Sequence, residues 1–210
     1  GNKTLYAQYS ANSYTVSYVL NDGSYGTNHP TSAKYDTAFT VDNPTHTHGT
    51  FAGWKITGMD GVTHTYGSQT TTDSSISSTK ATSSTATSFK NLRSTSGTVT
   101  FTAIWTCADG YQANTSCGAN TITLSWKNGG RGTAPTSPAS CKYGSTFTAP
   151  AAMTATGYTF SKWSVNNKTF DAGATINCTS ADLGVTSGTA TITGTWNANT
   201  FTISYAGNGN

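Results

Sequence analysis

Large apolar residues alternate with Ser and Thr in three similar stretches of the chain. Each stretch begins with an Ala-Asn pair and then has an apolar side chain at every second position; the three are residues 11–18, 119–126 and 198–205. Alternation of this length is typical of a β-strand with one buried face. The sequence therefore predicts the same half-buried strand at three places.

A second pattern, rich in aromatic residues, also occurs three times, at residues 5–9, 101–105 and 192–196. We interpret it as the closing strand of a repeated unit and the first pattern as the opening strand of the next unit. The junctions between them are very short, as at Asn197-Ala198. Because short linkers leave neighbouring modules little freedom, we expect the repeats to be joined end to end in a semi-stiff rod.

A longer motif lies between the opening and closing strands and occurs twice. Its copies share a Lys-Tyr pair, an aromatic residue four positions after the Tyr, and a Trp some fifteen positions later. The matching residues are Lys34, Tyr35, Phe39 and Trp54 in the first copy and Lys142, Tyr143, Phe147 and Trp163 in the second. A chance alignment would not keep this order and spacing, so the sequence contains an internal repeat.

The repeat divides the chain into five parts. They are residues 1–10, the last strand of a preceding repeat; 11–105, repeat one, with a Ser/Thr-rich insertion at about 57–97; 106–119, a connector bracketed by cysteines; 120–196, repeat two; and 197–210, the first strand of a following repeat. Within repeat one, the segment from Thr31 to Thr40 is predicted to form the second strand.

These motifs resemble the Listeria/Bacteroides-type repeat, the B-repeat of internalin-like bacterial surface proteins. Repeat two has the signature nearly whole, as Lys-Tyr-Gly-x-x-Phe at 142–147 and Gly-Tyr-Thr-Phe-x-x-Trp at 157–163. Repeat one departs from it, because Asp36 replaces the Gly after the Tyr and Gly-Thr-Phe at 49–51 replaces Gly-Tyr-Thr-Phe. The resemblance implies a mainly β fold of β-grasp-like α+β modules in tandem, and no catalytic residue is carried over.

The aromatic residues of the repeat are predicted to fill the cores of the two modules. Small β-modules with few aliphatic residues depend on aromatic side chains for buried area. The predicted core residues are Tyr18, Tyr35, Phe39, Trp54, Trp105, Trp126, Tyr143, Phe147, Trp163 and Trp196. For Trp54 and Trp163 we favour structural burial over a role as sugar-stacking platforms, because of their place within the repeat.

The insertion after Trp54 differs in composition from the rest of repeat one. Most positions from Ser68 to Ser88 are Ser or Thr, which leaves little apolar surface to bury. Repeat two has a closing strand without such a segment. We therefore expect residues 59–93 to be peripheral to repeat one, as an exposed β-hairpin or a glycan-decorated loop.

Composition excludes several classes of function. Charged residues make up only 9% of the chain, against about 25% in ordinary soluble domains, and the net charge is +3. The nearest approach to a basic cluster is Lys127 with Arg131, which is too small for a nucleic-acid footprint. No apolar run approaches the ~18 residues of a membrane span, so we expect no membrane insertion.

Four cysteines, Cys107, Cys117, Cys141 and Cys178, permit three pairings. Pairing of neighbours is the simplest, because one loop then lies in the connector and the other within repeat two. A site of four thiolates is the alternative, but no Cys-x-x-Cys spacing occurs. We expect Cys107–Cys117 and Cys141–Cys178, and hence an oxidising, extracellular location at the cell surface.

Metal-binding and catalytic groups are sparse. His46 and His48 would share one side of an extended segment, and His29 or His64 could add a third metal ligand only through tertiary contact; we favour surface histidines over a metal site. Of the possible acid and base groups, only His29, His46, His48 and Asp42 lie near one another in the sequence, and no nucleophile elbow or phosphate-binding loop occurs. We expect no enzyme and no cofactor.

Two functions from different classes remain. The first is a structural stalk or spacer in a bacterial adhesin or surface fibre, whose partners are the adjacent repeats of the same chain. The second is an adhesive module that binds a host glycan or protein through the repeat-one insertion. Repeat regularity favours the first function, whereas an insertion specific to repeat one favours the second.

Overall fold

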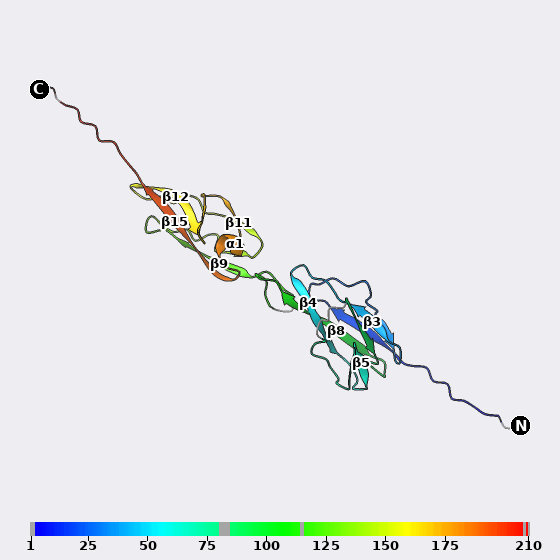
Figure 1. Ribbon diagram of the computed structural model, residues 1–210. Coiled ribbons are helices and arrows are strands. Elements are labelled where there is room, and N and C mark those ends of the chain that lie inside the picture. Colours follow the sequence, from blue (N-terminus) through cyan, green and yellow to red (C-terminus); the bar gives the residue numbers. More distant parts are fainter. Residues whose placement is uncertain (1–2, 80–84, 114–115, 208, 210) are drawn as a thin grey trace. The chain divides into compact units, whose positions relative to one another are not determined.

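The computed structural model describes residues 3–79, 85–113, 116–207 and 209. It is mainly β, as predicted, and contains several small sheets and one short helix. The chain divides into two compact units (Figure 1): Gly1–Ala108 with Gln112–Gly118, and Asp109–Tyr111 with Ala119–Asn210. The two units hold repeat one and repeat two, and each is described by itself.

The described residues of repeat one form eight strands in two sheets. The strands are β1 (Ser13–Val19), β2 (Ser32–Lys34), β3 (Phe39–Asp42), β4 (Gly49–Thr57), β5 (His64–Tyr66), β6 (Gln69–Thr71), β7 (Ala86–Lys90) and β8 (Thr98–Cys107). The larger sheet has the order β2-β1-β8-β4, and the second sheet has the order β3-β7-β5-β6. The opening strand β1 pairs in parallel with the closing strand β8, so the two patterns that frame the repeat lie side by side.

Repeat two has a similar arrangement with a smaller second sheet. Its elements are β9 (Thr121–Lys127), β10 (Ser140–Lys142), β11 (Thr146–Thr148), β12 (Tyr158–Val165), β13 (Lys168–Phe170), β14 (Thr175–Asn177), α1 (Ser180–Leu183) and β15 (Gly188–Ala198). The larger sheet has the order β10-β9-β15-β12-β13, and β11 pairs with β14. Here too the opening strand β9 pairs in parallel with the closing strand β15.

The predicted second strand of repeat one is two strands. A turn separates β2 from β3, and Asp36 within it has a φ of 60°. Glycine occupies the equivalent place in repeat two, where Gly144 has a φ of 81°. Left-handed backbone is uncommon outside glycine, although Asp tolerates it better than most residues. The expectation of one continuous strand over residues 31–40 is therefore wrong at its centre.

The expectation that residues 59–93 are peripheral is also wrong. Five side chains of this segment are almost completely buried: Met59, His64, Ile76, Phe89 and Leu92. Strand β7 pairs with β3 through Phe89 and Phe39, just as β14 pairs with β11 through Ile176 and Phe147. The end of the segment is therefore the counterpart of a core strand in repeat two. Residues 80–84 of the Ser/Thr-rich stretch lie outside the described residues.

The segments that flank the two repeats form no strand in the described residues. Residues 3–12 and 199–207 have no assigned secondary structure, and their large apolar side chains are exposed. Their assignment as strands of neighbouring repeats stays a prediction. Among the described residues, the chain has no helix with the length and apolar character to cross a membrane.

Candidate functional site

The ten aromatic residues that the sequence assigns to the cores lie in or at the edge of them. Trp54, Trp105, Trp126 and Trp163 are buried. The other six are half-buried: Tyr18, Tyr35, Phe39, Tyr143, Phe147 and Trp196. The indole nitrogen of Trp163 donates to the carbonyl oxygen of Pro150 at 3.0 Å. The indole nitrogen of Trp54 is buried, and no residue within the described ranges accepts its hydrogen bond. Trp54 and Trp163 are therefore core residues and do not expose a ring face to solvent.

Both disulfides are present, Cys107–Cys117 and Cys141–Cys178. Both cysteines of the first belong to the unit of repeat one, although residues 109–111 of the loop between them belong to the unit of repeat two. The second joins β10 to the residue that follows β14, inside the core of repeat two. Each disulfide therefore joins two cysteines of the same unit.

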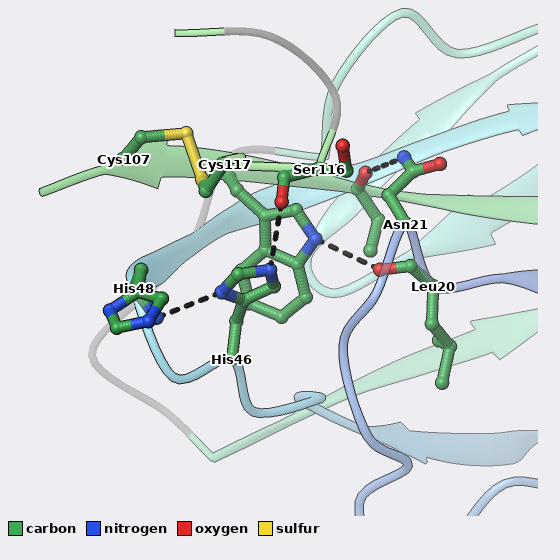
Figure 2. The surroundings of a disulfide bond; sticks show 9 residues. Leu20, Asn21, His46, His48, Cys107, Ser116 and Cys117 are labelled. Carbon is green, nitrogen blue, oxygen red and sulfur yellow. Dashed lines mark hydrogen bonds between the residues drawn. A yellow bond between two sulfur atoms is a disulfide. The ribbon is translucent and has the colours of Figure 1, made fainter. Parts of the chain in front are cut away.

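His46 holds the loop of the first disulfide against repeat one (Figure 2). The amide N–H of His48 donates to His46 Nδ1 at 2.9 Å, so this nitrogen must have a free lone pair. His46 Nε2 then has the proton and donates to the carbonyl oxygen of Ser116 at 3.2 Å. The imidazole also lies against the indole of Trp105, with 5.1 Å between the ring centroids. Both ring nitrogens of His46 are thus engaged within the protein.

Glycine at position 49 permits this packing. A Cβ atom there would lie 3.1 Å from Cys117 Sγ, 3.3 Å from Trp105 Cβ and 3.4 Å from His46 Cγ. Those distances are tighter than ordinary van der Waals contact. A side chain at this position would therefore require the disulfide, the indole or the imidazole to shift by a few tenths of an ångström.

The four histidines do not assemble into a metal site in the described residues. His64 is buried and its Nδ1 lies 2.8 Å from the carbonyl oxygen of Val62, whereas His29 is exposed and stacks on Tyr25. No group of three metal-binding side chains occurs within the described ranges. The possible third ligands for His46 and His48 are thus engaged elsewhere.

The outer face of the larger sheet in repeat one has an unusual set of residues. Val19 on β1, Thr102 on β8 and Lys55 on β4 are cross-strand partners and therefore form one row on this face. Val19 is 45% exposed, and Ile104 on the same strand as Thr102 is half-buried. We call this surface, defined by Val19, Lys55, Thr102 and Ile104, the outer face.

A hollow of about 360 Å³ lies on the outer face beside the disulfide loop. Its lining residues are Asn21, Lys55, Thr102, Ala103, Ile104, Trp105 and Ala113. A second hollow of about 260 Å³ is lined by residues 47–50 and 106–108. The first hollow has the size of a small-ligand site and a mostly apolar floor with polar groups around it. It is therefore the candidate site of the molecule.

Sequence reasoning did not single out Lys55, Ile104 or Val19. The alternation of β8 places Ile104 opposite in phase to Phe101, Ala103 and Trp105, which are buried. An isoleucine at an outward position was the available signal. The row with Lys55 and Val19 depended on strand register, which alternation alone does not give.

Two carboxylates, of half-buried Asp60 and buried Asp182, organise the polar structure of the units. Burial raises the pKa of Asp60, but hydrogen bonds from Ser94 and Thr95 outweigh it and hold the pKa of this carboxyl below its usual value. In repeat two, the hydrogen bond from Lys168 is the main cause of a lowered pKa at Asp182; burial opposes it, and bonds from Asn177 add to it. Both carboxylates therefore fix structure and face no hollow of the candidate site.

Comparison with known proteins gives one match. The model of the Listeria-Bacteroides repeat domain matches residues 14–77 and 121–185, together more than half of the chain. The first match begins in β1 and the second begins with β9, so each starts at the opening strand of a repeat. No curated protein and no solved structure matches the chain.

Proposed function

The chain belongs to the Listeria-Bacteroides repeat domain family, and on this premise we propose that its repeats are spacer modules of a bacterial surface protein. The observation that carries the proposal is that the chain builds the same sheet twice. In both units the opening and closing strands pair in parallel at the centre of the sheet, and the motif between them supplies the core. A spacer needs repeated, independently folded modules and no catalytic group.

The proposed location is extracellular, at the cell surface. Disulfides persist in oxidising compartments and are rare in the cytosol. Cys141–Cys178 lies in the core of repeat two, where Cys178 is fully buried, and the structure holds both disulfides without a free cysteine in the described residues. We propose β-grasp-like modules joined in a semi-stiff rod, with adjacent repeats of the same chain as partners, and neither nucleic-acid binding nor enzymatic activity.

The spacer proposal is tested in the full-length protein on its cell. Residues 11–196 are exchanged for two unrelated β-modules of similar length, and in a second strain they are deleted. A spacer predicts that adhesion or assembly is kept after the exchange and reduced after the deletion. Loss of function after the exchange, with the rest of the protein intact on the surface, would show that these repeats have a binding role of their own.

The location is tested separately. Native material is treated with a membrane-impermeant biotin reagent and then mapped by non-reducing peptide digestion. Labelled protein with Cys141 joined to Cys178 is expected. Four free thiols in native material, or protein that is labelled only after lysis, would contradict the extracellular assignment.

A second candidate function is adhesion through the repeat-one insertion. The observation that favours it is the β5–β6 hairpin, in which Gln69 and Thr70 are exposed although His64 at its base is buried. A host glycan or protein would then contact the hairpin tip. Substitution of Gln69 and Thr70 by Ala in the full-length protein separates this candidate from the spacer, which predicts unchanged adhesion.

A further inference from the structure

We propose that the hollow on the outer face of repeat one binds an acidic sugar, with its carboxylate on Lys55 and its ring on Ile104. The spacer function does not require this site, and the site is distinct from the β5–β6 hairpin. The proposal rests on the charge of Lys55, the apolar floor of the hollow, its rigid walls and the contrast with repeat two.

The charge comes from a cation that the protein itself does not use. Among the residues that the structure describes, the ion pairs of lysine are made by Lys90, Lys162 and Lys168, and the Lys55 ammonium has neither an ion pair nor a hydrogen bond. Lys55 lines the hollow and is exposed. An ammonium in this position favours a carboxylate, because charge-assisted hydrogen bonds are about twice as strong as neutral ones.

The floor of the hollow is apolar, and polar groups lie around it. Ile104 and Ala113 contribute alkyl surface, whereas the Ala103 side chain is buried on the inner face of the sheet. The Asn21 side-chain N–H donates to the carbonyl oxygen of Ala103 at 2.9 Å, which fixes the amide and leaves its oxygen as an acceptor. Thr102 adds a hydroxyl group. A simple anion would use Lys55 alone, and a hydrocarbon would use the floor alone, whereas a pyranose with a carboxylate uses both.

The walls are held in place before any ligand arrives. Trp105, on the inner side of β8, donates from its indole nitrogen to the carbonyl oxygen of Leu20 at 2.9 Å, and its ring packs on His46. This contact fixes the backbone next to Asn21, which lines the hollow. Ala113 lies within the loop that the Cys107–Cys117 disulfide closes. Preorganised walls reduce the entropy that binding must remove.

Repeat two provides the internal contrast. The same row on its sheet is Lys127, Thr193 and Ser164, so a lysine replaces Val19 and a serine replaces Lys55. Thr195 stands in the place of Ile104, and its hydroxyl group is bonded to the backbone N–H and C=O of Lys162. The equivalent face of repeat two therefore has its polar group satisfied within the protein and no apolar floor.

The experiment is a titration of the isotope-labelled chain followed by amide ¹⁵N–¹H NMR. The probes are sodium glucuronate and sodium N-acetylneuraminate, which distinguish a uronic acid from a sialic acid; glucose, sodium acetate and sodium benzoate are the controls. We expect saturable shifts at Thr102, Ile104 and Ala113 with at least one acidic sugar, and none at Thr193 and Thr195. Affinity should fall as salt is raised, because Lys55 is exposed.

Two variants graft residues of repeat two onto this face, Lys55→Ser and Ile104→Thr. Because Lys55 is exposed, Lys55→Ser should melt like the unaltered chain and bind the acidic sugar at least about tenfold more weakly. Ile104→Thr should weaken binding several-fold. Matched variants in repeat two, Ser164→Ala and Lys127→Ala, should leave the titration unchanged.

Three results would overturn the proposal. The first is the absence of saturable shifts with both acidic sugars. The second is equal affinity for glucose, or affinity that Lys55→Ser leaves unchanged, which would remove the role of the charge. The third is tighter binding of benzoate than of either sugar, which would assign the hollow to aromatic carboxylates. None of these results bears on the spacer function, which the module exchange tests by itself.

Discussion

Each repeat joins its larger sheet to its second sheet, and the two repeats do so by different means at the same place. In repeat two, Cys141 is joined by a disulfide to Cys178, the residue after β14. In repeat one the position of Cys178 is taken by Asn91, whose side-chain oxygen accepts a hydrogen bond from the amide N–H of Asp36 at 2.7 Å. A covalent link in one repeat is therefore replaced by a polar contact in the other.

Repeat one has a larger second sheet in addition to this contact. Strands β5 and β6 extend that sheet from two strands to four, and they bring His64 into the core. Arg93 and Asp60 tie the ends of the added segment together, through Arg93 to the carbonyl oxygen of Gly58 at 2.6 Å and Ser94 to Asp60 at 2.7 Å. The comparison shows that the same strand order tolerates either a crosslink or additional burial.

The largest effect is expected at the tryptophan of repeat two. Trp163→Ala should unfold repeat two and leave repeat one folded, because truncating a buried Trp costs about 3–5 kcal/mol, comparable to the stability of a small module. Trp163 is fully buried, and the substitution also removes its hydrogen bond to the carbonyl oxygen of Pro150. The measurement is thermal unfolding, followed for each unit separately through the NMR signals of its assigned amides. Unfolding of both repeats together would show that the units are not independent.

A similar loss is expected for Phe89→Ala in repeat one, of about 3–4 kcal/mol. Phe89 is fully buried and pairs with Phe39 across β7 and β3. Gln69→Ala, at the exposed tip of the same segment, is the matched control and should change stability by less than about 0.5 kcal/mol. Equal, small effects from the two substitutions would restore the interpretation of residues 59–93 as peripheral.

The third expectation concerns the crosslink itself. Replacing Cys141 and Cys178 together by Ala should lower the stability of repeat two by about 2–4 kcal/mol, since the disulfide closes a loop with a sequence separation of 37. Repeat one should melt as before. The double replacement of Cys107 and Cys117 is the control, and it should leave repeat two unchanged. A loss in repeat one from the first pair of substitutions would contradict the assignment of each disulfide to one unit.

Sequence alternation predicted the framing strands β1, β8, β9 and β15, because a half-buried strand has a period of two whatever its surroundings. Burial of Trp54 and Trp163 was predicted from their place within the repeat. Alternation did not predict strand β7, because the residues before Phe89 belong to a Ser/Thr-rich stretch that resembles a loop by composition. The break at Asp36 was missed although Gly144, the equivalent residue of repeat two, was the available signal for left-handed backbone at this position. The outer face with Lys55 required the register between three strands, which comes from tertiary pairing.

The smallest effect concerns acid and a carboxylate present only in repeat two. Asp182 is 8% exposed and accepts hydrogen bonds from Lys168 at 2.7 Å and from the Asn177 side chain at 3.0 Å. Its pKa is lowered in the folded state, mainly by Lys168. The ionised form is therefore favoured by folding, and the stability from it is complete above the unfolded pKa and lost as the pH falls through the folded pKa.

Repeat two should thus lose stability as the pH falls below about 4, the usual range of an Asp carboxyl. Asp182→Asn should lower the stability of repeat two by about 1–2 kcal/mol at neutral pH and reduce its further loss of stability in acid. The loss is modest because Lys168 is half-exposed and water screens part of the pair. Asp60→Asn in repeat one is the matched control. It should reduce the loss of stability of repeat one in acid and leave the pH dependence of repeat two unchanged. Chemical denaturation of each unit between pH 3 and 7 measures both. An unaltered loss of stability in acid in the Asp182→Asn variant would mean that other carboxylates set the acid sensitivity of repeat two. The pair of Lys168 and Asp182 would then be a surface contact that does not help to hold β13 to α1.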